Sequence, residues 1–99
     1  MDEEISETSV ALTASMARIN AELEALSELI KVKDRQLNIA AQRSREELKM
    51  FRLGRTLLNF VIQSQDEVQE AKMERLEVVG RIVQLKVERL ALMDLLAND

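Results

Sequence analysis

An apolar residue recurs at alternating steps of four and three positions between residues 12 and 30 of this 99-residue chain. The six positions are Leu12, Met16, Ile19, Leu23, Leu26 and Ile30. This spacing places all six side chains along one stripe of an α-helix, at the a and d positions of a coiled coil. A β-strand, in which side chains alternate between two faces, would scatter them over both. The sequence therefore predicts an all-α chain whose first segment packs against another helix.

The residues that interrupt helices are almost absent, with no Pro and only two Gly. Because each of these residues weakens a helix interior, their scarcity leaves few places where the chain can turn. Gly54 lies near the middle of the chain, and Gly commonly follows the last residue of a helix, while Thr56 could cap the next one. The sequence predicts a long antiparallel helical hairpin, a single coiled-coil domain over residues 1–99. Its helices are expected at about 4–51 and 57–97, with a turn at about 52–56 and frayed first residues.

Three other layouts remain open at this point. The segment Ser64-Gln65-Asp66-Glu67 has the form of a capping box, so the chain could turn there instead. A three-helix arrangement and a continuous helical rod are the other two.

The heptad changes phase after Ile30. A strict repeat places Lys33 in the stripe, whereas one extra four-residue step places Asp34 there. Such a stutter predicts weaker packing between residues 31 and 45.

The last segment carries two adjacent apolar rows, one through Leu76, Val83 and Leu90 and one through Ile82 and Leu85. Two rows are more than a two-stranded contact needs, so this helix is expected to pack against at least two neighbours. We therefore expect the hairpin to assemble into a helical-bundle oligomer. The residues predicted to form the helix-packing or partner interface are Leu12, Met16, Ile19, Leu23, Leu26, Ile30, Leu76, Val79, Ile82, Val83, Leu85, Leu90, Leu92, Met93 and Leu96.

Charge is distributed in blocks, with an acidic beginning, a basic middle and an acidic end within a net charge of −4. Residues 31–55 hold eight bases against three acids. Charge complementarity between helices, which sets register and orientation, is the favoured interpretation. The alternative is nucleic-acid or anionic-surface binding through the basic block 31–55, with a possible basic patch at Arg43, Arg45, Lys49 and Arg52. The acidic total and the scarcity of aromatic residues argue against nucleic acid.

Three smaller features have two interpretations each. Phe51 and Phe60, together with the apolar residues around Gly54, are interpreted as a hydrophobic plug at the hairpin end rather than as an exposed binding spot. The dispersed Met residues are interpreted as core filling rather than as an adaptable binding surface. Gly80 is interpreted as a place of close helix approach, with a simply tolerated Gly as the alternative.

The chain lacks the residues that most catalytic and metal sites require. It has no His and no Cys, which removes the usual zinc, haem and iron–sulfur ligands and the common nucleophile–base pairs. Gly54 and Gly80 are isolated, so no glycine-rich phosphate loop is present. We therefore expect no catalytic, cofactor-binding or metal-binding residues, no cofactor and no enzymatic activity.

The predicted function is a protein–protein interaction module: a small coiled-coil subunit, adaptor or assembly chaperone. Its partners are expected to be protein helices, either of a second copy or of another subunit, and nucleic acid is not favoured. Uncharged stretches such as residues 56–65 are too short to span a bilayer, so no transmembrane segment is expected. The acidic residues after Met1 are unlike a signal peptide, which favours a cytoplasmic or otherwise intracellular location.

Overall fold

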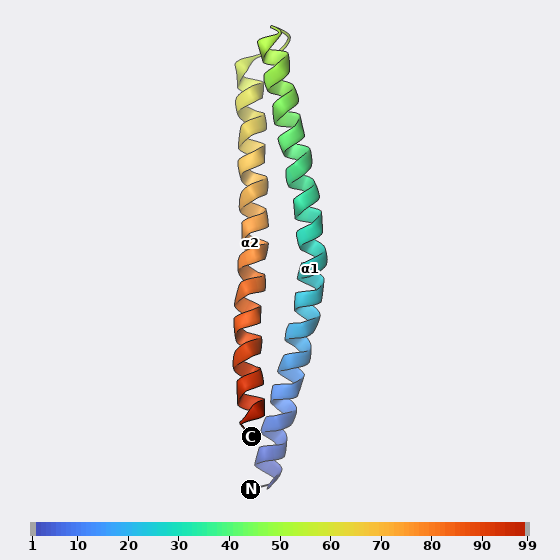
Figure 1. The fold of residues 1–99 in the computed structure, drawn as a ribbon, viewed down its shortest axis with the longest axis vertical. Coiled ribbons are helices and arrows are strands. Elements are labelled where there is room, and N and C mark those ends of the chain that lie inside the picture. The colour runs from blue at the N-terminus through green and yellow to red at the C-terminus, as the bar shows by residue number, and fades with distance from the viewer. Residues whose placement is uncertain (1, 99) are drawn as a thin grey trace. The chain divides into compact units, whose positions relative to one another are not determined.

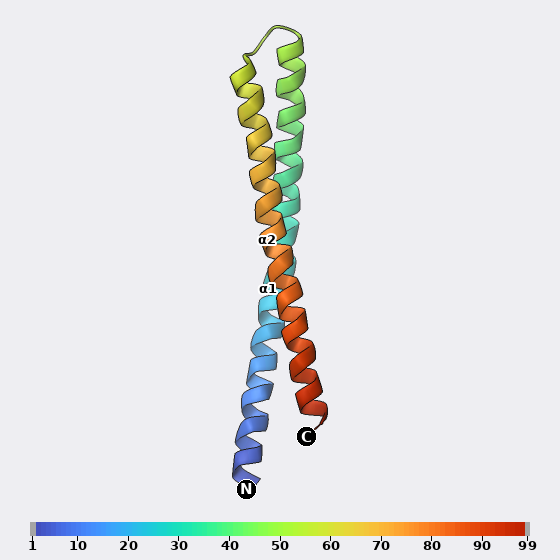
Figure 2. The same cartoon turned by 90° about the vertical axis from the view of Figure 1, so that its left-hand side faces the viewer.

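A computed structural model of the chain describes the backbone of residues 2–98 and the side chains of residues 7–98. It contains two long helices that pack against each other, α1 (Asp2–Arg52) and α2 (Leu58–Ala97), and no strand in the described part (Figures 1 and 2). The predicted all-α helical hairpin is confirmed. The rod, the three-helix arrangement and the turn at Ser64 are not adopted.

The helix bounds differ slightly from the expected ones. The backbone of α1 is helical from Asp2, two residues before the expected start, and Met1 lies outside the described residues. The predicted fraying of the first residues stays a prediction. The turn occupies residues 53–57, one position along from the expected 52–56, and α2 begins at Leu58.

The end of α1 is closed by a Schellman motif. Gly54 has a φ of 71°, its amide donates to the carbonyl of Phe51 (2.9 Å), and the amide of Arg55 donates to the carbonyl of Met50 (2.9 Å). These two bonds satisfy carbonyl groups that have no helical partner at the end of α1. Gly54 is the residue that permits this geometry, because an L side chain clashes with the backbone at positive φ.

Neither of the two polar side chains suggested as helix caps occupies a cap position in the structure. Thr56 makes no side-chain hydrogen bond within the described residues, and α2 begins two residues later. Ser64 lies inside α2, where it is buried and its hydroxyl donates to the carbonyl of Val61 (2.7 Å). A Ser that bonds to the preceding turn in this way is satisfied without ending the helix, so the capping-box form did not mark a helix start.

Contacts divide the chain into two compact units, each built from parts of both helices. Unit 1 is Met1–Glu28 with Gly80–Asp99, and unit 2 is Leu29–Val79, which includes the turn. The single domain expected over residues 1–99 stays a prediction.

Unit 1 has its packed centre at Ile19 of α1 and Leu85 of α2, which are 4% and 1% exposed. The α2 residues that face α1 here follow a strict heptad through Ile82, Leu85, Arg89, Leu92 and Leu96, all buried or half-buried. An ion pair between Arg81 and Glu22 (2.9 Å) and a hydrogen bond from Arg89 to Asn20 (3.3 Å) border this contact. Apolar packing at the centre with polar contacts at its border is the arrangement of a two-helix coiled coil.

In unit 2 the buried apolar side chains, Val61 and Val78, both belong to α2. None of the α1 side chains from residue 29 to residue 52 is fully buried. Lys33 and Asp34, the two positions that could continue the heptad after Ile30, are both half-buried. Neither phase of the heptad is therefore clearly preferred at this point of α1. Lys33 pairs with Glu74 (3.2 Å) and Asp34 pairs with Arg75, so ion pairs stand where apolar packing is thin. Neither described helix contains a stretch that is long and apolar enough to cross a membrane.

The two glycines should respond to Ala in opposite ways. At Gly54 the positive φ is strained for Ala, so Gly54→Ala should lower the free energy of unfolding by about 1 kcal/mol. Gly80 lies within α2 and a Cβ there would meet nothing within 4 Å, so Gly80→Ala should raise the free energy of unfolding by about 0.5–1 kcal/mol. Urea denaturation followed by circular dichroism measures both. Equal effects of the two substitutions would contradict the turn geometry.

Leu85 and Leu90 provide a matched pair of truncations on α2. Leu85 is 1% exposed and Leu90 is 66% exposed. Leu85→Ala should lower the free energy of unfolding by about 2–3 kcal/mol, because the side chain loses its packing against α1. Leu90→Ala should change it by less than about 0.5 kcal/mol in dilute protein, where no partner covers that position. If both substitutions had the same effect in dilute protein, the assignment of Leu85 to the packed face would be wrong.

Candidate helix-packing interface

The fifteen residues predicted for the interface fall into two sets by exposure. Eleven are covered at least in part: Ile19 and Leu85 are buried, and Leu12, Met16, Leu23, Leu26, Ile30, Val79, Ile82, Leu92 and Leu96 are half-buried. The other four, Leu76, Val83, Leu90 and Met93, are exposed. The contact between α1 and α2 therefore uses only part of the apolar surface that the sequence offers.

The two apolar rows of α2 have distinct roles. The row through Ile82 and Leu85 faces α1, whereas Val83 and Leu90 belong to a row on the other side of the helix. Arg89, which the sequence interpretation did not include, lies between Leu85 and Leu92 in the row that faces α1. The heptad spacing could have identified Arg89, because residues 85, 89 and 92 follow the alternating steps of four and three.

In unit 1 the exposed row is a second heptad stripe, formed by Gly80, Val83, Val87 and Leu90 and called here the outer row. Val83, Val87 and Leu90 are 55%, 61% and 66% exposed. At 3.6 residues per turn these positions lie nearly opposite the residues that face α1. Val87 was missed by the sequence interpretation, although its spacing from Val83 and Leu90 marks it as a member. An a/d stripe that neither described helix covers is therefore exposed on α2.

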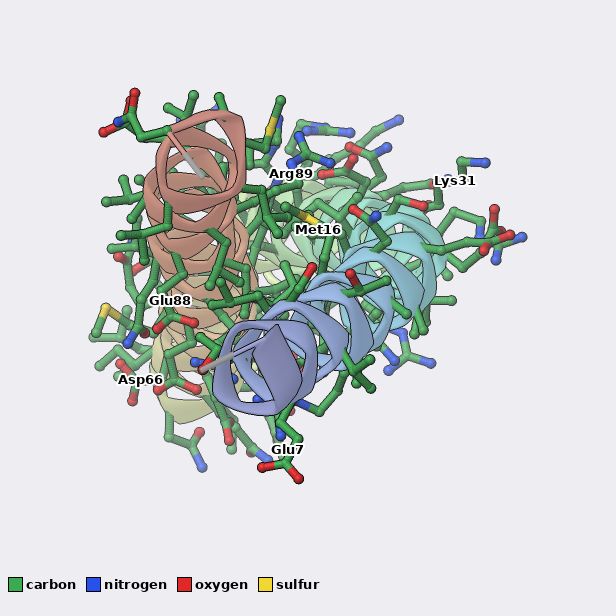
Figure 3. All side chains as sticks on the ribbon, turned by 90° about the horizontal axis from the view of Figure 1, so that it is seen from below. Glu7, Met16, Lys31, Asp66, Glu88 and Arg89 are labelled. Carbon is green, nitrogen blue, oxygen red and sulfur yellow. The ribbon has the colours of Figure 1, made fainter. Side chains whose placement is uncertain are left out.

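Beside the outer row an open groove of about 610 Å³ lies between the two helices of unit 1. It is lined by Met16, Asn20, Lys86, Arg89, Leu90 and Met93. In Figure 3 the side chain of Met16 lies in the space between α1 and α2, whereas Glu7 points away from it. Because Leu90 belongs both to the groove and to the outer row, the apolar surface is continuous from one to the other. The two Met side chains can adapt to an irregular occupant.

The four residues of the possible basic patch are all exposed, but they do not form one surface. Arg45, Lys49 and Arg52 are spaced four and three residues apart and so share one side of α1. Arg43 lies on another side, where it lines a shallow depression together with Glu46 and Glu47. Two nearby carboxylates offset the charge of Arg43, so it does not extend the patch.

Among the described side chains, three ion pairs show charge complementarity between α1 and α2. Lys33 of the basic middle contacts Glu74, while Asp34 pairs with Arg75 and Glu22 with Arg81. Five of these six side chains are at least 39% exposed and Lys33 is 22% exposed. Exposed pairs of this kind each contribute at most about 1 kcal/mol, so they orient the helices more than they hold them together.

Three interpretations of single features are wrong in whole or in part. The plug expected around Phe51 and Phe60 is not formed: Phe51 is 38% and Phe60 47% exposed, and Val61 is the buried member of that cluster. Gly80 does not mark a close approach between α1 and α2, because a Cβ at that position would meet nothing within 4 Å. Three of the Met residues interpreted as core filling, Met50, Met73 and Met93, are exposed.

The apolar surface of unit 1 is the candidate site, since the described residues contain no group of three or more Asp or Glu side chains placed to hold a metal ion. The outer row and the groove together offer apolar side chains at helical spacing with cations at their edge, a surface suited to a helix. No protein-family model, curated protein or solved structure matches this chain.

Proposed function

We propose that this protein is a non-enzymatic protein–protein interaction module that acts through helix–helix packing. A partner helix, from a second copy of the chain or from another subunit, covers the outer row of α2. The observation that carries the proposal is the heptad spacing of Val83, Val87 and Leu90, which are exposed on the side of α2 away from α1. A small coiled-coil subunit, an adaptor and an assembly chaperone would all use such a surface.

The heptad spacing of the outer row supports a helical partner more strongly than the exposure of its side chains does. Single apolar side chains on a protein surface are ordinary, but a contiguous apolar patch marks an interaction surface. A stripe with steps of four and three residues presents knobs to the holes of a facing helix. Full burial of one Val or Leu side chain contributes about 1.5–3 kcal/mol relative to full exposure, so three that are more than half exposed retain several kcal/mol for association.

The edges of the outer row set the chemistry of the partner. Lys86 lies between the outer row and the groove, and Arg89 lines the groove beside it. Acidic side chains at the flanking positions of the partner helix would therefore complement this edge. Gly80 has no side chain and open space around it, so a partner backbone can approach α2 closely at that position.

The alternative use of the basic block 31–55 for nucleic acid has less support. Lys33 already contacts Glu74, and Arg43 lies apart from Arg45, Lys49 and Arg52 beside Glu46 and Glu47. The scarcity of aromatic residues leaves little for bases to stack on.

Charge placed on the outer row tests the proposal. Val83→Glu with Leu90→Glu introduces carboxylates that a partner helix would have to bury unpaired, which should weaken association by roughly a hundredfold or more. Solution mass from sedimentation, together with circular dichroism over a dilution series, measures this. We expect the unaltered chain to self-associate, or to lose helicity on dilution because a partner subunit is missing. In the first case the double variant should have the mass of one chain.

Leu95→Glu is the matched control, because Leu95 is 54% exposed and lies on the polar side of α2 with Gln84 and Glu88 rather than in the outer row. It should leave the mass and the dilution behaviour unchanged. A chain that remains a fully helical monomer at every concentration would contradict the proposal.

A further inference from the structure

The turn of unit 2 is surrounded by exposed apolar side chains. Leu53, Leu57, Leu58, Phe60 and Ile62 are each between 47% and 65% exposed. Turns are normally built from Gly, Asn, Asp, Ser and Pro, which suit the backbone and remain in water. Here Leu stands at both ends of the turn, at positions 53 and 57, so the end of the hairpin is more apolar than the turn geometry requires.

The same end is purely cationic. No acidic residue occurs between Glu47 and Asp66, whereas Lys49, Arg52 and Arg55 lie in that interval. All three are exposed, and none forms an ion pair within the described residues. These cations are therefore available to an external anion, unlike Lys33, which contacts Glu74.

The apolar and cationic side chains lie at matching heights. Residues 49–62, called here the tip, comprise the last turn of α1, the turn itself and the first turn of α2. At a rise of 1.5 Å per residue, Lys49 and Ile62 are each only about 6 Å along the helix axis from the turn. Amphipathic elements at membranes bury their apolar side chains about 5–10 Å into the boundary between headgroups and acyl chains. From that depth the long Lys and Arg side chains can extend outward to the lipid phosphates.

We propose that the tip binds the surface of an anionic lipid bilayer. Leu53, Leu57, Leu58, Phe60 and Ile62 enter the interface, while Lys49, Arg52 and Arg55 contact the lipid phosphates. A bilayer fits better than an acidic protein groove because the apolar side chains surround a protruding turn instead of forming one stripe or pocket. Nucleic acid would leave the Leu side chains in water. This proposal is independent of the function proposed for the outer row, because it concerns other residues and is tested by vesicle binding instead of by solution mass.

The first experiment measures co-sedimentation of the full chain with phosphatidylcholine vesicles, with and without phosphatidylserine. We expect binding to the anionic vesicles at low salt that weakens as salt rises. Leu53→Ser with Leu57→Ser, and separately Arg52→Glu with Arg55→Glu, should each weaken it by about tenfold or more. Arg52→Lys with Arg55→Lys should retain it. Because the altered side chains are exposed, helicity by circular dichroism should be unchanged in every variant.

Matched controls change the same chemistry away from the tip. Val32→Ser with Ile39→Ser removes exposed apolar side chains from α1, and Arg35→Glu with Arg43→Glu makes the same change in net charge. Both should bind anionic vesicles as the unaltered chain does. The chain contains no Trp, so Leu57→Trp provides a single reporter whose emission should shift to the blue on binding. The emission of Ile39→Trp should not shift.

Three results would overturn the proposal. One is the absence of binding to anionic vesicles at low salt. Another is an equal loss of binding in the tip variants and in their controls, which would make the attraction a property of overall charge. The third is a change in solution mass caused by Leu53→Ser with Leu57→Ser in a chain that binds no vesicles, which would assign the tip to a protein partner.

Discussion

The interaction on which this structure depends is the apolar packing between its two helices. Ile19 and Leu85 in unit 1, and Val61 and Val78 in unit 2, are its buried apolar members among the described side chains. A two-helix contact can bury only one side of each helix, because the remaining surface of each cylinder faces solvent. The interior is therefore small, and polar contacts such as Arg81 with Glu22 border it instead of adding to it.

That constraint explains why so much apolar surface remains exposed. α2 carries two heptad rows, and α1 can cover one of them, so the outer row has no neighbour within the described chain. The tip is exposed for a different reason. Helices that end in a short turn have no further element to pack over Leu53 and Leu57. The outer row, which is regular and narrow, suits another helix, whereas the tip, which is irregular and cationic, suits a lipid surface.

Much of the fold could be predicted because it depends on local spacing. The stripe from Leu12 to Ile30 lies on the contact with α2, and the helices turn around Gly54 with its positive φ. Less of the candidate site could be predicted from the sequence. Sequence spacing identified both rows of α2 but not which of them faces α1, since either row could pack equally well in isolation. Arg89 and Val87 were missed because a charged residue in a packed row and a Val in an exposed one both contradict simple expectations.

Local signals also failed where their outcome depends on the neighbouring helix. Ser64 has the sequence of a cap but lies buried within α2, where its hydroxyl bonds to the carbonyl of Val61. The apolar cluster around Phe51 and Phe60 resembles a core, yet both Phe side chains remain exposed and, among its described members, only Val61 is buried. Burial is a property of what surrounds a residue, and composition does not report that.

The sequence by itself determined the helical state, the apolar stripes and the position at which a left-handed residue ends α1, because helix period and glycine geometry are properties of a short segment. It also determined the scarcity of groups capable of catalysis. Only the tertiary structure decided that Ile82 and Leu85 face α1 and that Val83 and Leu90 do not. It also decided that most apolar side chains of the tip are exposed to solvent. The physical reason is that two helices share one contact, and the choice of contact leaves every other apolar side chain for something outside the chain.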